Sequence, residues 1–173
     1  GSAWWSRAKK SARVLAEGSG TKVEYRLAAA GGAEDEIRSA FAAATLSQQT
    51  DLARRHGGRD RDLTAEMTAA LLAGAGRPGE AAGTAWEAVT VAARLGAAAD
   101  AVATARKDLL QRHGARVLLD EIGDPFQREE AMALVRECAA DWPALFAAQL
   151  ELETNARLLT RTAGELWEAG EGA

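Results

Sequence analysis

Apolar residues recur at helical spacing along most of the chain, and glycine or proline separates them into helix-length segments. Residues 33–56 give the clearest example, because acidic residues occupy the first turn and basic residues the last, as the helix dipole favours. Gly57 would end this helix as a left-handed residue. Its buried stripe would consist of Ile37, Phe41, Ala44 and Leu52.

The same pattern predicts further helices downstream, over residues 63–73, 80–95, 98–113, 117–122, 124–140 and 141–168. Asp62 would cap the first of these, and Asp124 followed by Pro125 is a strong start signal for the helix that begins there. In the long last helix the apolar positions follow a 3-4 repeat typical of a bundle or coiled-coil seam. We expect an association seam formed by Leu152, Asn155, Leu159 and Leu166.

The first 32 residues depart from this pattern. Residues 3–17 are basic, and residues 22–27 alternate strictly, which makes them the one strand-like run. A lone strand has no pairing partner, so a helix or a linker is the alternative interpretation of that run. The chain is therefore predicted to consist of an N-terminal basic arm over 1–32 and an α-helical domain over 33–173.

Composition supports close-packed helices. Hydrophobic residues make up 47% of the 173 residues, and alanine, the best helix former, supplies many of them. We predict an all-α protein, either a multi-helix bundle or an irregular array of αα-hairpins, with about six to seven helices. The net charge of −4 disfavours broad binding to nucleic acids or anionic membranes.

Candidate chemistry is sparse. Residues 74–79 match GxGxxG, but no strand precedes them and Pro78 removes an amide donor, so an ordinary interhelical loop is expected. A cluster of carboxylates is explained by helix capping and the helix dipole: Asp120, Glu121, Asp124, Glu129 and Glu130. We therefore predict neither a metal nor another cofactor.

We interpret the two histidines and the single cysteine as structural residues as well. His56 and His113 end near-copies of one heptapeptide, each followed by glycine, which is typical of independent helix ends. A duplicated unit or a catalytic histidine pair is the alternative. Cys138 lies beside apolar residues and is expected to be a buried small hydrophobe.

Ala92, Gly96 and Val102 have the spacing of a helix-turn-helix motif, in which small residues let two helices approach at a sharp turn. Sequence-specific recognition of DNA requires polar or basic side chains on the second helix of the motif, and in this chain that helix is mostly alanine. The residues that could contact DNA are Thr104, Arg106 and Lys107.

The segment 76–81 also resembles the turn between the paired helices of the tetratricopeptide repeat family. Ala81, Ala85 and Ala88 stand at the small-residue positions of that family. The resemblance covers residues 62–140 at most, and it does not keep the 34-residue period of the repeat. It implies a protein-binding groove between stacked helix pairs.

The basic arm is a second candidate for partner binding. An aromatic pair beside cations suits a partner groove, although the tryptophans could instead pack back on the helices. The residues concerned are Trp4, Trp5, Arg7 and Lys10.

Our first hypothesis is a non-catalytic helical protein–protein interaction module, that is, an adaptor, a chaperone-like protein or a regulatory subunit. The alternative is a helix-turn-helix DNA-binding regulator using residues 85–113, and an enzyme with unrecognised chemistry ranks last. We expect an unidentified protein partner, with homo-oligomer formation open and nucleic acid disfavoured. The lack of a signal peptide, of a membrane-spanning run and of a disulfide framework favours a cytoplasmic location.

Overall fold

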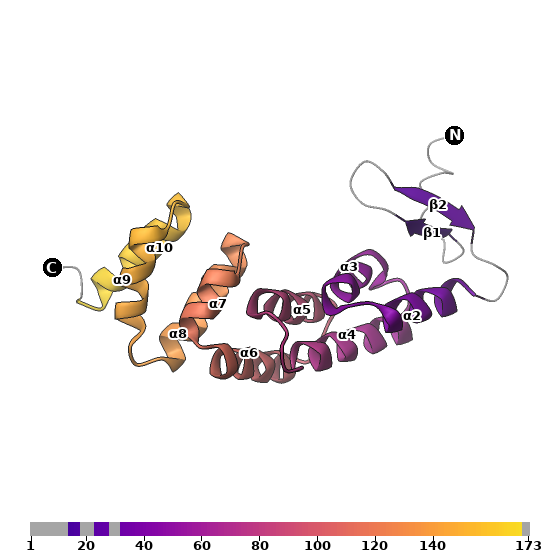
Figure 1. The fold of residues 1–173 in the computed structure, drawn as a ribbon, viewed down its shortest axis with the longest axis horizontal. Coiled ribbons are helices and arrows are strands. Elements are labelled where there is room, and N and C mark those ends of the chain that lie inside the picture. The colour runs from indigo at the N-terminus through magenta and orange to yellow at the C-terminus, as the bar shows by residue number, and fades with distance from the viewer. Residues whose placement is uncertain (1–13, 18–22, 28–31, 171–173) are drawn as a thin grey trace. The chain divides into compact units, whose positions relative to one another are not determined.

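The computed structural model describes residues 14–17, 23–27 and 32–170, and most of these are helical (Figure 1). The predicted all-α class is confirmed, with nine helices in the described residues instead of six or seven. The elements are β1 (Val14–Glu17), β2 (Glu24–Leu27), α2 (Ala33–Ala43), α3 (Leu46–His56), α4 (Arg61–Ala75), α5 (Ala82–Arg94), α6 (Ala99–His113), α7 (Ala115–Glu121), α8 (Pro125–Cys138), α9 (Trp142–Leu152) and α10 (Ala156–Glu168).

The chain forms two compact units. Unit 1 extends to Met67 and unit 2 begins at Thr68, so the boundary falls within α4. The separation of an arm over residues 1–32 from a domain over 33–173 remains a prediction, because most of that arm lies outside the described residues.

Unit 1 contains a pair of antiparallel strands. β1 pairs with β2 in the register Val14 to Leu27 and Glu17 to Glu24. The strand-like run therefore has a partner, and the expectation of an unpaired strand is wrong. The partner was missed because β1 is four residues long, which is too short for its alternation to stand out from the basic segment around it.

A break at Ala44 and Thr45 divides the predicted helix over 33–56 into α2 and α3. Ala44 is extended, and Thr45 begins α3 with a capping box. The Thr45 hydroxyl accepts from the Gln48 amide at 3.4 Å, and Gln48 Oε1 accepts from the Thr45 amide at 3.0 Å. The Thr-x-x-Gln pattern could have predicted this start, because it satisfies two otherwise unpaired helix amides.

The start of α4 also differs from the prediction. Asp60 caps this helix, since its Oδ1 accepts from the Leu63 amide at 2.8 Å. Asp62, the residue expected to cap, lies exposed in the first turn, where its charge still suits the helix dipole.

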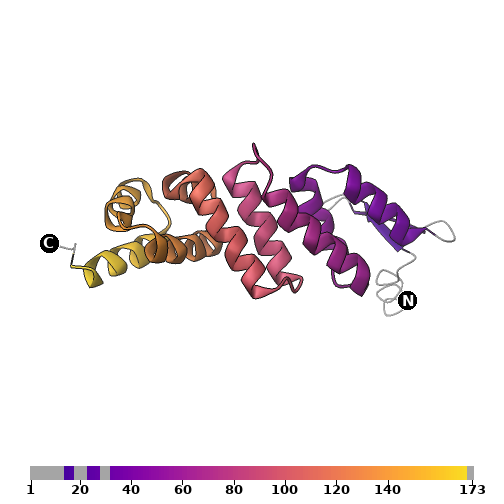
Figure 2. The same cartoon turned by 90° about the horizontal axis from the view of Figure 1, so that it is seen from below.

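Unit 2 is an array of helices that pack on their near neighbours in sequence. The most extensive contacts join α5 to α6 and α7, α6 to α7, α7 to α8, and α10 to α8 and α9 (Figures 1 and 2). Trp86 on α5 and Phe146 on α9 are fully buried. This arrangement matches the predicted αα-hairpin array, in which short loops place consecutive helices side by side.

Small residues allow close approach between helices in two places. Ala92 and Val102 are buried where α5 meets α6, and Gly96 makes the turn between them with φ +97°. Gly83 on α5 lies so close to the backbone of α7 that a Cβ at this position would be only 2.5 Å from the Glu121 carbonyl oxygen. The helix-turn-helix spacing of these residues is thus explained by the close packing of α5 against α6.

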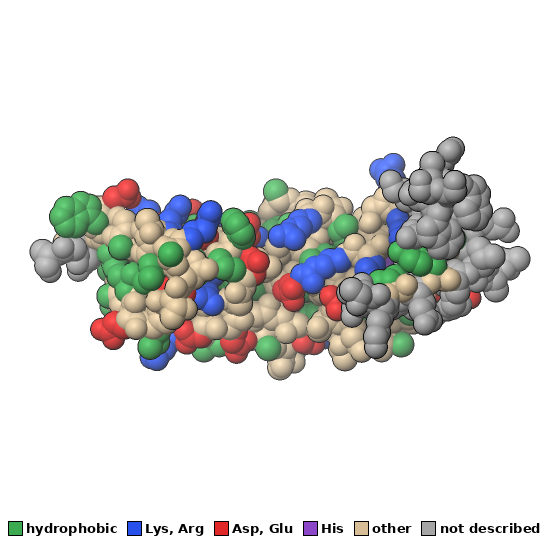
Figure 3. Space-filling model, turned by 90° about the horizontal axis from the view of Figure 1, so that it is seen from above, with side chains coloured by type: hydrophobic (Ala, Val, Ile, Leu, Met, Phe, Trp, Pro, Cys, Tyr) green, Lys and Arg blue, Asp and Glu red, His purple; other side chains and the backbone are tan. Residues whose placement is uncertain are grey.

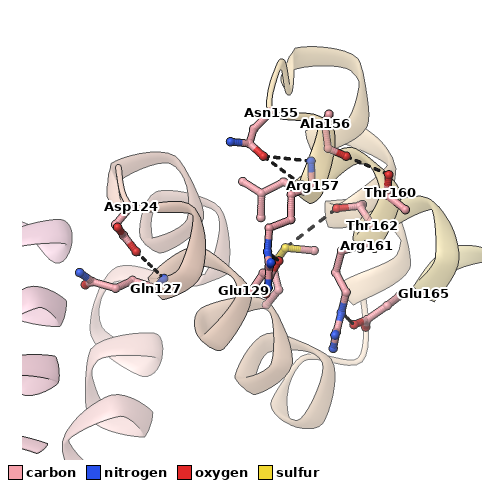
Figure 4. A network of polar contacts seen from close by, with 12 residues as sticks. Asp124, Gln127, Glu129, Asn155, Ala156, Arg157, Thr160, Arg161, Thr162 and Glu165 are labelled. Carbon is pink, nitrogen blue, oxygen red and sulfur yellow. Dashed lines mark hydrogen bonds and ion pairs between the residues drawn. The ribbon is translucent and has the colours of Figure 1, made fainter. Parts of the chain in front are cut away.

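The predicted single helix over 141–168 is wrong as well. It is divided into α9 and α10, and Asn155 caps α10 by accepting from the amides of Arg157 at 3.0 Å and Leu158 at 3.3 Å (Figure 4). Asn155 therefore does not occupy a core position of a seam. Leu166 is buried inside unit 2 while Leu152 is 74% exposed, so the four seam residues do not share one face.

Candidate functional site

An open groove of about 520 Å³ lies where the α6–α7 junction meets the α8–α9 junction. Leu110, Val117 and Leu145 supply its apolar part. The remaining lining side chains are mostly polar or small, and they include Lys107, Gln111, His113, Arg116, Cys138 and Asp141. The groove combines an apolar floor with a charged rim, which is the usual composition of a binding site.

Tight helix junctions place these side chains together. Gly114 is the one residue between α6 and α7, and its φ of +79° allows the chain to change direction at once. Its amide still donates to the Leu110 carbonyl at 2.9 Å, which closes the last turn of α6. On the other side, residues 139–141 connect α8 to α9. Short connections leave the helix ends uncovered, so their side chains line the groove.

Cys138 was expected to be buried, and that expectation is wrong. The thiol is free and exposed, and the residue lines the groove together with His113 and Asp141. Cys138 follows the buried Val135 by three positions, which is the spacing of a core residue. It is also the last residue of α8, where no facing helix covers it, and this could not be inferred from periodicity.

The two histidines both end helices, as their sequence context predicted. The amide of Gly57 donates to Ala53 at the end of α3, and the corresponding glycine closes α6 in the same way. The left-handed residue after α3 is Gly58, with φ +80°, and not Gly57 as predicted. His56 is buried in unit 1, whereas His113 is half-buried beside the groove, so their similar sequences lead to different environments.

Burial gives His56 a pH-dependent role in stability. Burial first, and then the charges of Arg59 and Arg55, lower the pKa of His56 from 6.5 to about 4. The folded chain therefore keeps this imidazole neutral, while the unfolded chain protonates it as the pH falls below 6.5. Unit 1 should lose about 2 kcal/mol of stability from this group between pH 7 and pH 5.

Urea unfolding of the wild type and of His56→Gln at pH 7, 6 and 5 measures this contribution. The stability advantage of the wild type over the variant should shrink as the pH falls, because the variant has no group there to protonate. A difference that stays constant over this range would contradict a neutral buried histidine.

The predicted carboxylate cluster is divided among separate partners. Each carboxylate accepts a hydrogen bond from a different group: Asp120 from the Gln149 side chain, Glu121 from the Gly83 amide, Asp124 from the Gln127 amide, Glu129 from Arg157 and Glu130 from Arg106. Within the described residues, no group of three or more acidic, histidine or cysteine side chains could hold a metal ion. These carboxylates position helices.

Ion pairs attach the α9–α10 hairpin to α8 and so support the α9 side of the groove (Figure 4). Glu129 on α8 accepts two bonds from the Arg157 guanidinium, and Arg128 pairs with Glu153. The buried Glu165 pairs with Arg136 at 3.1 Å and with Arg161 at 2.5 Å. Bidentate and multiply paired contacts of this kind fix geometry better than single exposed pairs do.

These pairs also change the acidity of two carboxyl groups. The hydrogen bond from Arg157 lowers the pKa of Glu129 below its ordinary value. Burial would raise the pKa of Glu153, but the amides of Asn155 and Thr154 and the charge of Arg128 outweigh it and leave this pKa lowered. Both groups therefore stay ionised and paired at neutral pH.

Of the other residues predicted from sequence that the structure describes, Lys107 alone lies at the groove. Trp4, Trp5, Arg7 and Lys10 lie outside the described residues. Thr104 and Lys107 are exposed, and Lys107 also lines the groove. Arg106 is half-buried: its guanidinium carbon lies 4.9 Å from the ring centroid of Trp86, and it pairs with Glu130.

The segment that matches GxGxxG is an interhelical loop, as predicted. Gly74 belongs to α4, which ends at Ala75, and residues 76–81 connect it to α5. The element directly before the loop is the helix α4 and not a strand, so the strand–turn–helix arrangement of a phosphate site is missing there.

No protein-family model, curated protein or solved structure matches this chain. Among the described residues, no helix has both the length and the apolar content needed to cross a membrane.

Proposed function

We propose that this protein is a non-catalytic helical interaction module, an adaptor, chaperone-like or regulatory protein, and that the groove receives a segment of its partner. The observation that supports this most directly is the open groove itself. Val117 is 41% exposed within it, although an apolar side chain of this size gains free energy when it is covered.

The openness of the groove favours a protein segment over a small molecule. Lys107, Gln111, Arg116 and Asp141 are all exposed along its rim. Small-molecule sites bury most of the ligand surface, whereas a rim of this kind suits an apolar anchor of a peptide with polar groups around it.

The charges of the rim suit a partner segment that carries an acidic group near its anchor. Lys107 has no ion pair with any described residue, and Arg116 has only a contact of 3.9 Å to Asp120 at 78% exposure. Exposed pairs of this length contribute little, so both cations keep their charge available for a partner.

The helix-turn-helix alternative receives less support. Of the three residues expected to contact DNA, Arg106 is engaged with Glu130 and Trp86, and the exposed residues beside it on α6 include Ala103 and Asp108. Base reading needs exposed donors and acceptors at these positions. We therefore do not propose DNA binding.

A selection of displayed random peptides on the purified chain tests the proposed function. Peptides enriched on the wild type should bind Val117→Asp at least about 10-fold more weakly, because the new charge would be desolvated against the peptide anchor. Fluorescence polarisation with the enriched peptides measures the change.

Ala103→Asp is the matched control, because it places the same charge at an exposed position of α6 outside the groove. Binding to this variant should stay within about twofold of the wild type. The proposal fails if no peptide is enriched, or if both variants weaken binding equally.

A further inference from the structure

A second open pocket, of about 420 Å³, lies in unit 2 where the start of α5 meets the end of α7 and the start of α8. Among the described residues, its lining includes three carboxylates, those of Glu87, Glu121 and Asp124, and no lysine, arginine or histidine. Figure 3 shows acidic and basic side chains interspersed over the surface that it colours, so the single sign of charge sets this pocket apart. The pocket shares no lining residue with the groove, so an inference from it does not depend on the function proposed above.

Two of these carboxylates use only one oxygen each to hold the fold. Glu121 Oε2 accepts from the Gly83 amide at 3.1 Å. Asp124 Oδ1 accepts from the Gln127 amide at 2.9 Å. Both acidic residues are exposed, and neither has an ion pair with any described residue, so their second oxygens are available to a ligand. Glu87 already has an interaction of its own.

The helix ends at the pocket offset this charge only in part. Both α5 and α8 begin there, and a helix N-terminus carries about half a positive charge. Together the two ends offset about one of the two available carboxylate charges, so about one negative charge remains for a ligand. The pocket therefore favours a ligand group with a single positive charge.

Gln127 gives an independent indication that a polar group binds here. Its side chain lines the pocket and the residue is only 9% exposed, yet its amide group makes no hydrogen bond with any described residue. Figure 4 shows this side chain extending from the start of α8 on the side away from α10. Leaving a buried amide unpaired is unfavourable, so a ligand that bonds to it gains affinity.

We propose that this pocket binds the guanidinium group of an arginine side chain from a partner protein. A guanidinium spreads five N–H donors over a planar fork, which matches separate acceptor oxygens on Glu121, Asp124 and Gln127. Within the described residues, no group of three or more acidic, histidine or cysteine side chains could hold a metal ion. A cation with spread donors therefore fits these acceptors better than a point charge does.

An arginine within a polypeptide also uses the other half of the Gln127 amide. The amide oxygen would accept from the guanidinium, while the NH₂ group would donate to a backbone carbonyl next to the arginine. Free arginine would instead bring its own carboxylate, which an acidic pocket repels. The pocket therefore suits a side chain of a partner better than the free amino acid.

Nuclear magnetic resonance of the isotope-labelled whole chain tests the proposal, with N-acetylarginine amide as the probe. The backbone amide of Gly83 and the side-chain amide of Gln127 should shift in a saturable way, with a dissociation constant of about 1 mM. The lysine and citrulline analogues should bind at least about 5-fold more weakly, because the first lacks the fork and the second lacks the charge. Absence of saturable shifts up to about 20 mM, or equal binding of either analogue, would overturn the proposal.

Removing the two available charges should weaken the probe. Glu121→Gln combined with Asp124→Asn should raise the dissociation constant at least about 10-fold, although each replacement keeps an oxygen for its structural hydrogen bond. The matched control, Asp100→Asn combined with Asp108→Asn, removes two charges on α6 outside the pocket and should stay within about twofold of the wild type. Equal weakening of the two double variants would indicate general attraction to an acidic chain, and it would rule out this pocket.

Gln127→Leu tests the buried amide without changing any charge. Leucine is similar in size, and the backbone amide that Asp124 binds is kept, so the fold should persist. The probe should bind this variant at least about 3-fold more weakly, as followed by the Gly83 amide. Unchanged or tighter binding would contradict the proposed role of this side chain and overturn the site.

Free arginine distinguishes the source of the guanidinium. It should bind more weakly than N-acetylarginine amide, because its carboxylate is repelled and it carries no neighbouring amide carbonyl. Tighter binding of free arginine would identify a small-molecule site and overturn the assignment to a partner side chain.

Discussion

Replacing Trp86 by alanine should lower the free energy of unfolding of unit 2 by about 3–5 kcal/mol, the range for large aromatic side chains removed from a core. Trp86 is 0% exposed, and it lies on the α5 face that packs against α6 and α7. The Arg106 guanidinium covers its ring at 4.9 Å and would lose that contact too. Chemical denaturation followed by far-ultraviolet circular dichroism measures the loss.

Trp86→Phe is the matched control for this substitution. The indole Nε1 has no hydrogen-bond partner among the described residues, so phenylalanine removes volume without breaking a bond. The expected loss is about 1–2 kcal/mol, because an aromatic face still lies beneath Arg106. Equal losses for the two variants would contradict a cost that increases with the buried volume removed.

The elements that sequence predicted best are those with both a periodic core and a local end signal. Asp124 and Pro125 fixed the start of α8, because the side-chain cap and the proline act within one helical turn. The same local chemistry was present in Thr45 and Gln48, yet the strong periodicity of residues 33–56 outweighed it. Periodicity alone does not distinguish one helix from two that bury the same stripe.

The division of the last predicted helix has a related cause. Leucine spacing continues through residues 152–159, so the apolar pattern gives no sign of a break. The break depends on polar contacts: the Glu153 carboxylate accepts from the amides of Thr154 at 2.9 Å and Asn155 at 2.7 Å. Such side chain to backbone bonds compete with the helix ladder, and Asn155 can then cap the next helix.

The groove could not be predicted because it joins residues that are distant in sequence. His113 and Arg116 come from one helix junction and Cys138 and Asp141 from the next, and neither junction contains a recognisable motif. Ion pairs such as Glu129 with Arg157 span 28 residues, so the acidic residues that are close in sequence have partners on distant helices. Local spacing predicts faces of helices, and only packing determines which faces meet.

Replacing Gly83 by alanine should destabilise unit 2 by about 3 kcal/mol, although alanine normally favours a helix over glycine by about 1 kcal/mol. The new Cβ would lie 2.5 Å from the Glu121 carbonyl oxygen and 3.1 Å from its carbon, and both atoms belong to the backbone of α7. A rotamer change cannot relieve this contact, so α7 must move away from α5. That movement also weakens the bond from the Gly83 amide to Glu121 Oε2, which measures 3.1 Å.

Gly164→Ala provides the matched control, because a Cβ at that helical position meets nothing within 4 Å. This variant should gain up to about 1 kcal/mol from helix propensity alone. Urea midpoints of the two variants should therefore move in opposite directions from the wild type. A gain in both would mean that α5 and α7 do not approach closely at Gly83, and the packing that connects the first helices of unit 2 would need to be redrawn.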